Sequence, residues 1–74
     1  MPIVTIQVTR ESPGGAAAVT ADEKAALIAG VTEVLRRVLD KPPDATFVVI
    51  EEVDLDNWGW GGLPVAEFRR RMGR

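Results

Sequence analysis

Residues 2–9 read Pro-Ile-Val-Thr-Ile-Gln-Val-Thr, and they decide the fold because they place a strand at the start of the chain. These residues are mostly β-branched, and apolar and polar side chains nearly alternate. Val4, Ile6 and Val8 share one face of the expected strand, while the other face is polar. We therefore expect a half-buried strand over residues 3–9.

A helix is expected after a loop over residues 10–19. Thr20-Ala-Asp-Glu23 has the Ser/Thr-x-x-Glu form of a capping box. Apolar residues then recur at helical spacing, at Ile28, Val31, Leu35 and Val38. Pro42 and Pro43 stop the helix, so it is expected to end near Leu39.

A second strand is expected over residues 45–53, where the unbroken apolar run Phe47–Ile50 indicates cover on both faces. The helix covers one face, and a second subunit is the simplest cover for the other. Strand, helix and strand in this order predict parallel strands with a right-handed crossover. The glycines within residues 58–62 indicate turns or a short hairpin, and residues 65–72 form a short helix or arm. The fold class is α/β (α+β), in a single domain over residues 1–74.

The chain has 74 residues, 46% of them hydrophobic, and contains neither cysteine nor histidine. A domain of this size buries only about 60% of its unfolded surface, and no disulfide supports it here. We therefore expect a homo-oligomer that completes its core with other subunits. The formal charge of −2 gives no reason to expect nucleic acid. The sequence has no apolar run that spans a bilayer and no signal peptide, so we expect a cytoplasmic protein and no membrane partner.

Composition also restricts the chemistry. Without histidine and cysteine, neither a Ser-His-Asp nor a Cys-His arrangement is possible, and the commonest metal ligand is missing. We expect no metal and no cofactor. The adjacent Glu51 and Glu52 point to opposite faces of a strand, so they cannot act together as a carboxylate pair.

Pro2 is the main candidate for a base at neutral pH. A proline after Met1 permits removal of the initiator, which leaves a secondary amine at the start of the first strand. An α-amino group titrates at about pH 8, and burial or a nearby cation lowers this pKa further. The neutral amine can then take a proton from a carbon next to a carbonyl group.

The chain opens a strand with Pro2-Ile3 and continues with Leu39-Asp-Lys-Pro42, Val48-Val-Ile-Glu-Glu52 and Asn57-Trp-Gly-Trp-Gly-Gly62. These segments resemble the 4-oxalocrotonate tautomerase family over nearly the full chain, and the aromatic-Gly-x-Gly-Gly segment is the most specific part. The resemblance implies a tautomerase-like β-α-β unit with parallel strands and a short C-terminal hairpin. It also implies a hexamer built as a trimer of dimers, with active sites shared between subunits.

The resemblance assigns roles to individual residues. Pro2 matches the family's amino-terminal proline, the general base that moves protons between enol and keto forms. Trp58 matches the aromatic residue that walls the pocket. Gly59, Gly61 and Gly62 match the turn that follows.

Two positions depart from the family pattern. The family arginine that holds the substrate carboxylate falls at Ser12 when counted from Pro2 without gaps, and Arg10 lies close enough to substitute for it. A second family arginine, on the second strand, is replaced by Phe47. The ring of Phe47 cannot donate a hydrogen bond to an oxyanion, so the site has a base but an altered electrophile.

Other groups can replace that arginine. The Arg69–Arg71 cluster can arrive from a neighbouring subunit, although a solvated or interface charge run is the favoured interpretation. Asn57 can donate its amide to a carbonyl oxygen, and its place in a turn is a sufficient structural reason for it. Trp58 and Trp60 alternate and face different ways, so Trp60 is assigned to an interface.

The expected activity is a cofactor-free tautomerase that acts on a small-molecule 2-oxo acid or its enol. Pro2 is the base and acid, Arg10 the carboxylate binder, and Trp58 and Phe47 the pocket walls, with Asn57 as a further substrate contact. Two alternatives stay open. One is a superfamily decarboxylase or dehalogenase-type hydratase that uses a protonated Pro2 with water, and the other is an oligomeric protein that has lost catalysis.

Overall fold

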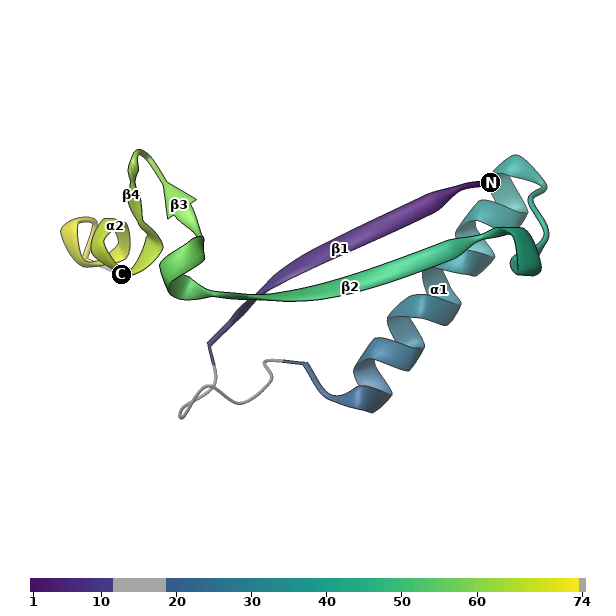
Figure 1. The fold of residues 1–74 in the computed structure, drawn as a ribbon, viewed down its shortest axis with the longest axis horizontal. Helices are drawn as coiled ribbons and strands as arrows, with labels where there is room; N and C mark the ends of the chain where they lie inside the picture. Colours follow the sequence, from purple (N-terminus) through teal and green to yellow (C-terminus); the bar gives the residue numbers. More distant parts are fainter. Residues whose placement is uncertain (12–18, 74) are drawn as a thin grey trace. The chain divides into compact units, whose positions relative to one another are not determined.

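The computed structural model describes residues 1–11 and 19–73, and two long strands run through it (Figure 1). Strands β1 (Ile3–Arg10) and β2 (Phe47–Asp54) form one two-stranded sheet, and helix α1 (Ala21–Leu39) connects them. The backbone N of Phe47 donates to the O of Pro2, and further along β1 the hydrogen bonds to β2 join residues 44 positions apart. When paired residues of two strands keep a nearly constant difference in residue number, the strands are parallel. The predicted β-α-β unit is therefore confirmed.

The chain divides into two compact units. We call residues 1–7 and 19–51 the strand–helix unit, and residues 8–18 and 52–74 the hairpin unit. The loop expected over residues 10–19 lies largely outside the described residues, and so does Ser12.

Helix α1 begins at the predicted capping box. The Oγ1 of Thr20 accepts from the backbone N of Glu23 at 3.1 Å, and the Glu23 carboxylate accepts from the backbone N of Thr20 at 2.9 Å. The backbone hydrogen bond from Thr20 also lowers the pKa of Glu23. The helix ends at Leu39, and Asp40 follows in a left-handed conformation with a φ of 54°. The predicted limits of this helix are confirmed.

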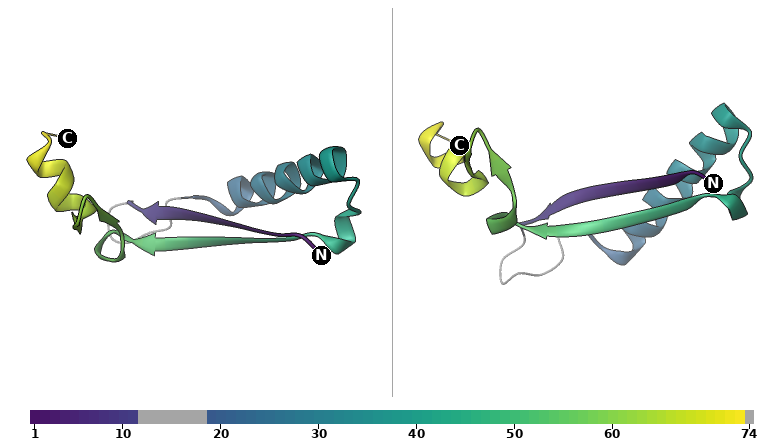
Figure 2. Two further views of the ribbon diagram at one scale, coloured as in Figure 1. Left: turned by 90° about the horizontal axis from the view of Figure 1, so that it is seen from above. Right: turned by 45° about the horizontal axis from the view of Figure 1, so that its top comes forward.

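Within the strand–helix unit, the sheet has one covered face and one open face. Val4, Ile6, Val48 and Ile50 are half-buried and alternate with exposed residues. Figure 2 shows α1 along one side of the two strands. The alternation therefore separates side chains that face α1 from side chains that face away from it, and the predicted inward face of β1 is confirmed.

Strand β2 begins later than the sequence predicts. Pro43–Ala45 forms a 3-10 turn, and the strand starts at Phe47 rather than at Ala45. The backbone N of Ala45 donates to the O of Pro42 at 3.0 Å. The fixed φ of Pro43 suits the first position of such a turn, and this local geometry keeps Ala45 and Thr46 out of the strand.

The hairpin unit continues from β2 with short elements. They are η3 (Leu55–Asn57), β3 (Gly59–Trp60), β4 (Leu63–Pro64) and α2 (Val65–Arg71). Strand β3 pairs antiparallel with β4, and Gly61 and Gly62 form the turn with φ values of 65° and 84°. A two-residue hairpin turn of type I′ requires two successive positive φ values, and glycine adopts them without strain. The predicted hairpin and terminal helix are confirmed.

The described part of the chain lacks a closed hydrophobic core. Val65, 1% exposed, is the only buried residue there. Ile3 is 67% exposed and Phe47 is 49% exposed, and several apolar side chains of α1 are also accessible. None of the described helices is long and apolar enough to cross a membrane. Apolar surface of this extent is typical of a face that binds another protein.

Candidate active site

Pro2 immediately precedes β1, and its carbonyl group fixes its position. The O of Pro2 accepts a hydrogen bond from the backbone N of Phe47 at 3.0 Å. Pro2 is half-buried, whereas Met1 is 85% exposed. Met1 is therefore accessible for removal, and its loss would leave a secondary amine beside the start of β2.

Phe47 is the first residue of β2, and its side chain lies on the open face of the sheet. Ile3 and Val49 are exposed on the same face. The structure thus brings Pro2 and Phe47 together, with two exposed apolar side chains on the same face as Phe47.

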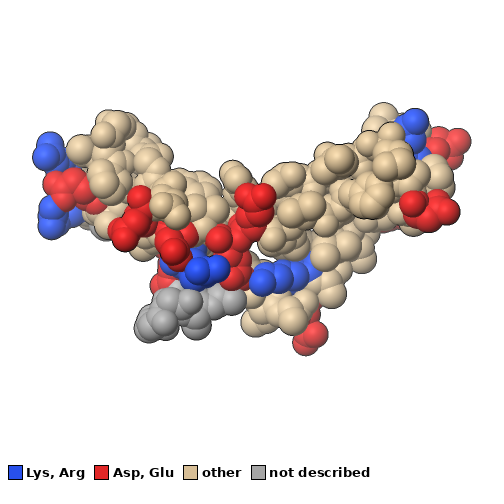
Figure 3. Space-filling model, viewed as in Figure 1, with Lys and Arg blue, Asp and Glu red and all other residues tan. Residues whose placement is uncertain are grey.

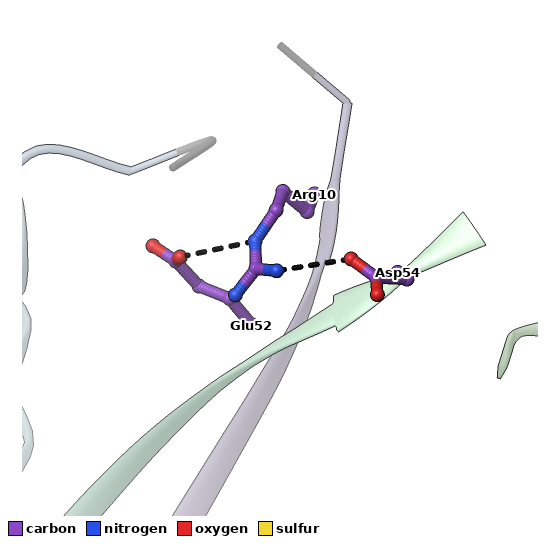
Figure 4. A network of polar contacts seen from close by, with 3 residues as sticks. All are labelled: Arg10, Glu52 and Asp54. Atoms are coloured by element: carbon purple, nitrogen blue, oxygen red, sulfur yellow. Dashed lines mark hydrogen bonds and ion pairs between the residues drawn. The ribbon is translucent and has the colours of Figure 1, made fainter. Parts of the chain in front are cut away.

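Arg10 ends β1 and is held by two carboxylates, which together with it form the Arg10 network (Figure 4). Its Nη1 lies 2.9 Å from Oδ1 of Asp54, and its Nε lies 3.5 Å from Oε2 of Glu52. The Glu52 side chain is only 10% exposed, so the ion pair offsets part of the cost of burying that charge. A guanidinium has five N–H donors in a rigid fork, so Arg10 keeps donors for a bound carboxylate.

Glu52 and Asp54 were not expected from the sequence as partners of Arg10. The predicted parallel pairing of the two strands could have pointed to them, because it places residues about 44 positions apart side by side. The expectation that Glu51 and Glu52 face opposite ways is confirmed. Glu51 accepts from Gln7 at 2.9 Å and is exposed, while Glu52 pairs with Arg10 and is half-buried.

Asn57 and Trp58 belong to the hairpin unit. Asn57 ends η3 and is exposed, while Trp58 is half-buried. The N of Trp58 donates to the O of Leu55 at 3.1 Å, and the O of Trp58 accepts from the N of Val65 at 2.9 Å. The backbone of Trp58 is thus held from both sides, which fixes the point from which its indole extends.

Trp60 stacks on Phe68, with ring centroids 4.3 Å apart and an interplanar angle of 25°. Glycine is needed at position 61 beside this stack, because a Cβ there would lie 2.8 Å from the Phe68 ring. The interface role predicted for Trp60 therefore concerns the part of its indole that Phe68 leaves exposed.

The Arg69–Arg71 cluster has partners within the hairpin unit. Arg69 lies 2.7 Å from Glu11, and its hydrogen bond lowers the pKa of Glu11. Arg70 and Arg71 both pair with Glu67. Each of these arginines is thus already paired with a carboxylate of its own unit.

The predicted site residues fall into two groups. Pro2 and Phe47 lie in the strand–helix unit and offer an aromatic ring and, once Met1 is removed, a secondary amine. Arg10, Asn57 and Trp58 lie in the hairpin unit and offer a guanidinium, an amide and an indole. Over the residues that the structure describes, no cluster of three or more acidic side chains is placed to hold a metal ion.

The family model described as "Tautomerase enzyme" matches residues 2–67 of the chain. The chain belongs to the tautomerase family. The probable tautomerase K2 of Dickeya dadantii (strain 3937) is 46% identical over 71 residues, which are 96% of this chain and 97% of that protein.

Solved structures of tautomerase relatives have the same fold. TomN, a 4-oxalocrotonate tautomerase homologue in the tomaymycin biosynthetic pathway, matches with a TM-score of 0.73 and 29% identity, over 99% of this chain and 100% of that one. A heterohexameric 4-oxalocrotonate tautomerase from Chloroflexus aurantiacus J-10-fl matches with a TM-score of 0.71 and 23% identity, over 93% of this chain and 100% of that one. The predicted 4-oxalocrotonate tautomerase family and its fold are confirmed.

Proposed function

We propose that this chain forms a cofactor-free tautomerase that interconverts the enol and keto forms of a 2-oxo acid. Pro2 acts as general base and general acid once Met1 has been removed. The observation that carries the proposal is the start of the family match at Pro2, the residue whose amine is exposed by loss of Met1. The hydrogen bond from Phe47 to Pro2 holds this residue beside an apolar wall.

The proton transfers balance within one cycle. The neutral prolyl amine takes the proton from the enol hydroxyl, and the carbonyl group forms. The resulting ammonium returns a proton to the neighbouring carbon, so an O–H bond breaks, a C–H bond forms and the amine is regenerated. Burial of Pro2 among apolar side chains in the assembly would favour the neutral amine, because desolvation disfavours the ammonium.

In this proposal, Arg10, Asn57 and Trp58 reach a given Pro2 from a neighbouring subunit. Pro2 and Arg10 are separated by eight positions of extended chain, which corresponds to about 26 Å. A small oxo acid cannot span this distance, so Arg10 of the same strand cannot hold a substrate that reacts at Pro2. Arg10 of another copy can bind the substrate carboxylate through its guanidinium fork.

The assembly is proposed to be a homo-oligomer, most specifically a hexamer of single domains of residues 1–74. Exposed apolar side chains apart from Phe47, such as Ile3, Leu39 and Val49, support it, because a second copy can bury them. The heterohexameric relative with the same fold also supports it. The cytoplasmic location expected from the sequence is part of the same proposal.

The test of this proposal blocks the amine of Pro2. Insertion of leucine between Met1 and Pro2 retains Met1 and converts the prolyl amine into an amide. This variant is expected to lose about 10²- to 10⁴-fold in kcat/KM, the usual contribution of a general base. Pro2→Ala is the matched variant that keeps a free, although primary, amine, and it should retain more activity.

Conversion of the phenylpyruvate enol is followed by ultraviolet absorbance, and intact mass verifies each N-terminus. A leucine-insertion variant as active as the wild type would show that the amine is not the base.

A further inference from the structure

The open face of the strand–helix unit carries no positive charge on its strands. Its outward side chains are Ile3, Thr5, Gln7, Phe47, Val49 and Glu51. Glu51 is the single charged residue in this set, and it accepts a hydrogen bond from Gln7. Figure 3 shows acidic and basic groups near the middle of the molecule and a tan, uncharged surface between them and the right-hand end. A molecule bound on the open face meets apolar groups and one acid.

The cationic residues of the strand–helix unit lie elsewhere. Lys24, Arg36 and Arg37 belong to α1, and Lys41 follows its C-terminal end. Helix α1 lies along the opposite side of the strands (Figure 2). Arg36 is already bound to Glu33 through hydrogen bonds of 2.7 and 2.8 Å. The outward side chains of the two strands therefore supply no cation to hold an anion.

Phe47 is placed to select among anionic substrates. Its backbone N donates to the O of Pro2, and the residue is 49% exposed. A carboxylate pressed against this ring loses water and gains no hydrogen bond, which is costly. An apolar or aromatic substituent in the same place is stabilised by burial and by ring stacking.

We infer that the site prefers 2-oxo acids with one carboxylate and an apolar or aromatic substituent, and that Phe47 sets this preference by excluding a second carboxylate. The inference rests on the proposed function, because it places the reacting enol at Pro2. The one carboxylate binds Arg10 of a neighbouring subunit, and the substituent lies against Phe47.

The test compares two substrates on the full-length protein without Met1. The enol of phenylpyruvate has one carboxylate and an aromatic substituent, whereas 2-hydroxymuconate has two carboxylates. The wild type is expected to favour the phenylpyruvate enol by at least about ten-fold in kcat/KM, a common size for discrimination within one pocket. Phe47→Arg should shift the ratio toward 2-hydroxymuconate by at least about ten-fold. Phe47→Leu, the apolar control, should keep the wild-type preference.

A comparison of two competitive inhibitors on the wild type tests the same preference without a variant, so it still applies if a Phe47 variant fails to fold or assemble. The unreactive monocarboxylate 3-phenylpropionate is expected to compete with substrate more strongly than the dicarboxylate adipate. Equal inhibition, or stronger inhibition by adipate, would overturn the inference without any variant.

The outcomes separate this inference from the proposed function. In one outcome, the protein converts both substrates, loses both activities when the amine is blocked, and converts 2-hydroxymuconate as well as or better than the phenylpyruvate enol. This result overturns the inferred selectivity and leaves the tautomerase proposal standing. No turnover of either substrate by protein with a free Pro2 overturns the proposed function and the inference with it. A preference for the phenylpyruvate enol that Phe47→Arg reverses supports both.

Discussion

Arg10 has one role within the chain and a second one in the proposed assembly. It pairs with Glu52 and Asp54 in its own chain, and in the proposal it binds the substrate carboxylate at the site of a neighbour. Arg10→Ala is expected to raise KM and to lower the free energy of unfolding by about 1 kcal/mol, since the ion pairs are only partly buried. Arg10→Lys keeps the charge without the fork, so it should recover stability more than KM. Steady-state kinetics and urea unfolding measure the two effects, and an unchanged KM in Arg10→Ala would contradict the binding role.

Glu11 contributes to stability in a pH-dependent way. The hydrogen bond from Arg69 lowers the pKa of Glu11 below its ordinary value of 4.5. Because the folded pKa lies below the unfolded one, the contribution is present above about pH 4.5 and is lost as pH falls through the folded pKa. Arg69→Gln should raise the pKa of Glu11 toward 4.5, as measured by NMR titration of its carboxyl carbon. Arg71→Gln, whose partner is Glu67, should leave the Glu11 titration unchanged. The contact would be refuted if Arg69→Gln had no effect.

The sequence predicts the neighbours of some site residues and not those of others. The closeness of Pro2 and Phe47 follows from parallel pairing of two strands that begin there. The partners of Arg10 do not follow from any local pattern, because Glu52 and Asp54 are brought to it only by the register of the sheet. Register depends on the packing of the whole unit, which a short window of sequence does not contain.

At the scale of elements, local signals predict most boundaries. The limits of α1 were predictable because the Thr20–Glu23 capping box and the prolines beyond Leu39 act within a few residues. The start of β2 was not, because Ala45 and Thr46 suit a strand by composition but are drawn into the turn at Pro43. Neighbouring proline geometry outweighed strand propensity there.

In the hairpin between β3 and β4, the cost of a strained backbone can be separated from the cost of a clash with a packed side chain. Gly61 and Gly62 both have positive φ, so alanine at either position costs about 1 kcal/mol. Only at Gly61 would the new Cβ meet the Phe68 ring, while the space at Gly62 is open. Gly61→Ala should therefore destabilise the protein more than Gly62→Ala and weaken the Trp60–Phe68 stack. Urea unfolding and tryptophan fluorescence measure this, and equal losses would contradict the packing at Phe68.

For the whole molecule, the central physical feature is the apolar face that a single chain leaves exposed. Ile3 and Val49 remain accessible, and Val65 alone is buried among the residues that the structure describes. A chain of 74 residues without disulfides is marginal alone. Light scattering is therefore expected to show an oligomer, with six chains of 8.0 kDa as the specific expectation. A stable monomer would contradict the proposal that copies of the chain cover this face.

The most direct test of the role of Pro2 combines two readings on one sample of the wild type. Intact mass determines whether Met1 has been removed, and ultraviolet absorbance follows conversion of the phenylpyruvate enol in the same solution. We expect a mass without Met1 and a rate well above that of buffer. A mass that shows free Pro2, together with no rate above buffer for either the phenylpyruvate enol or 2-hydroxymuconate, would contradict the proposed function.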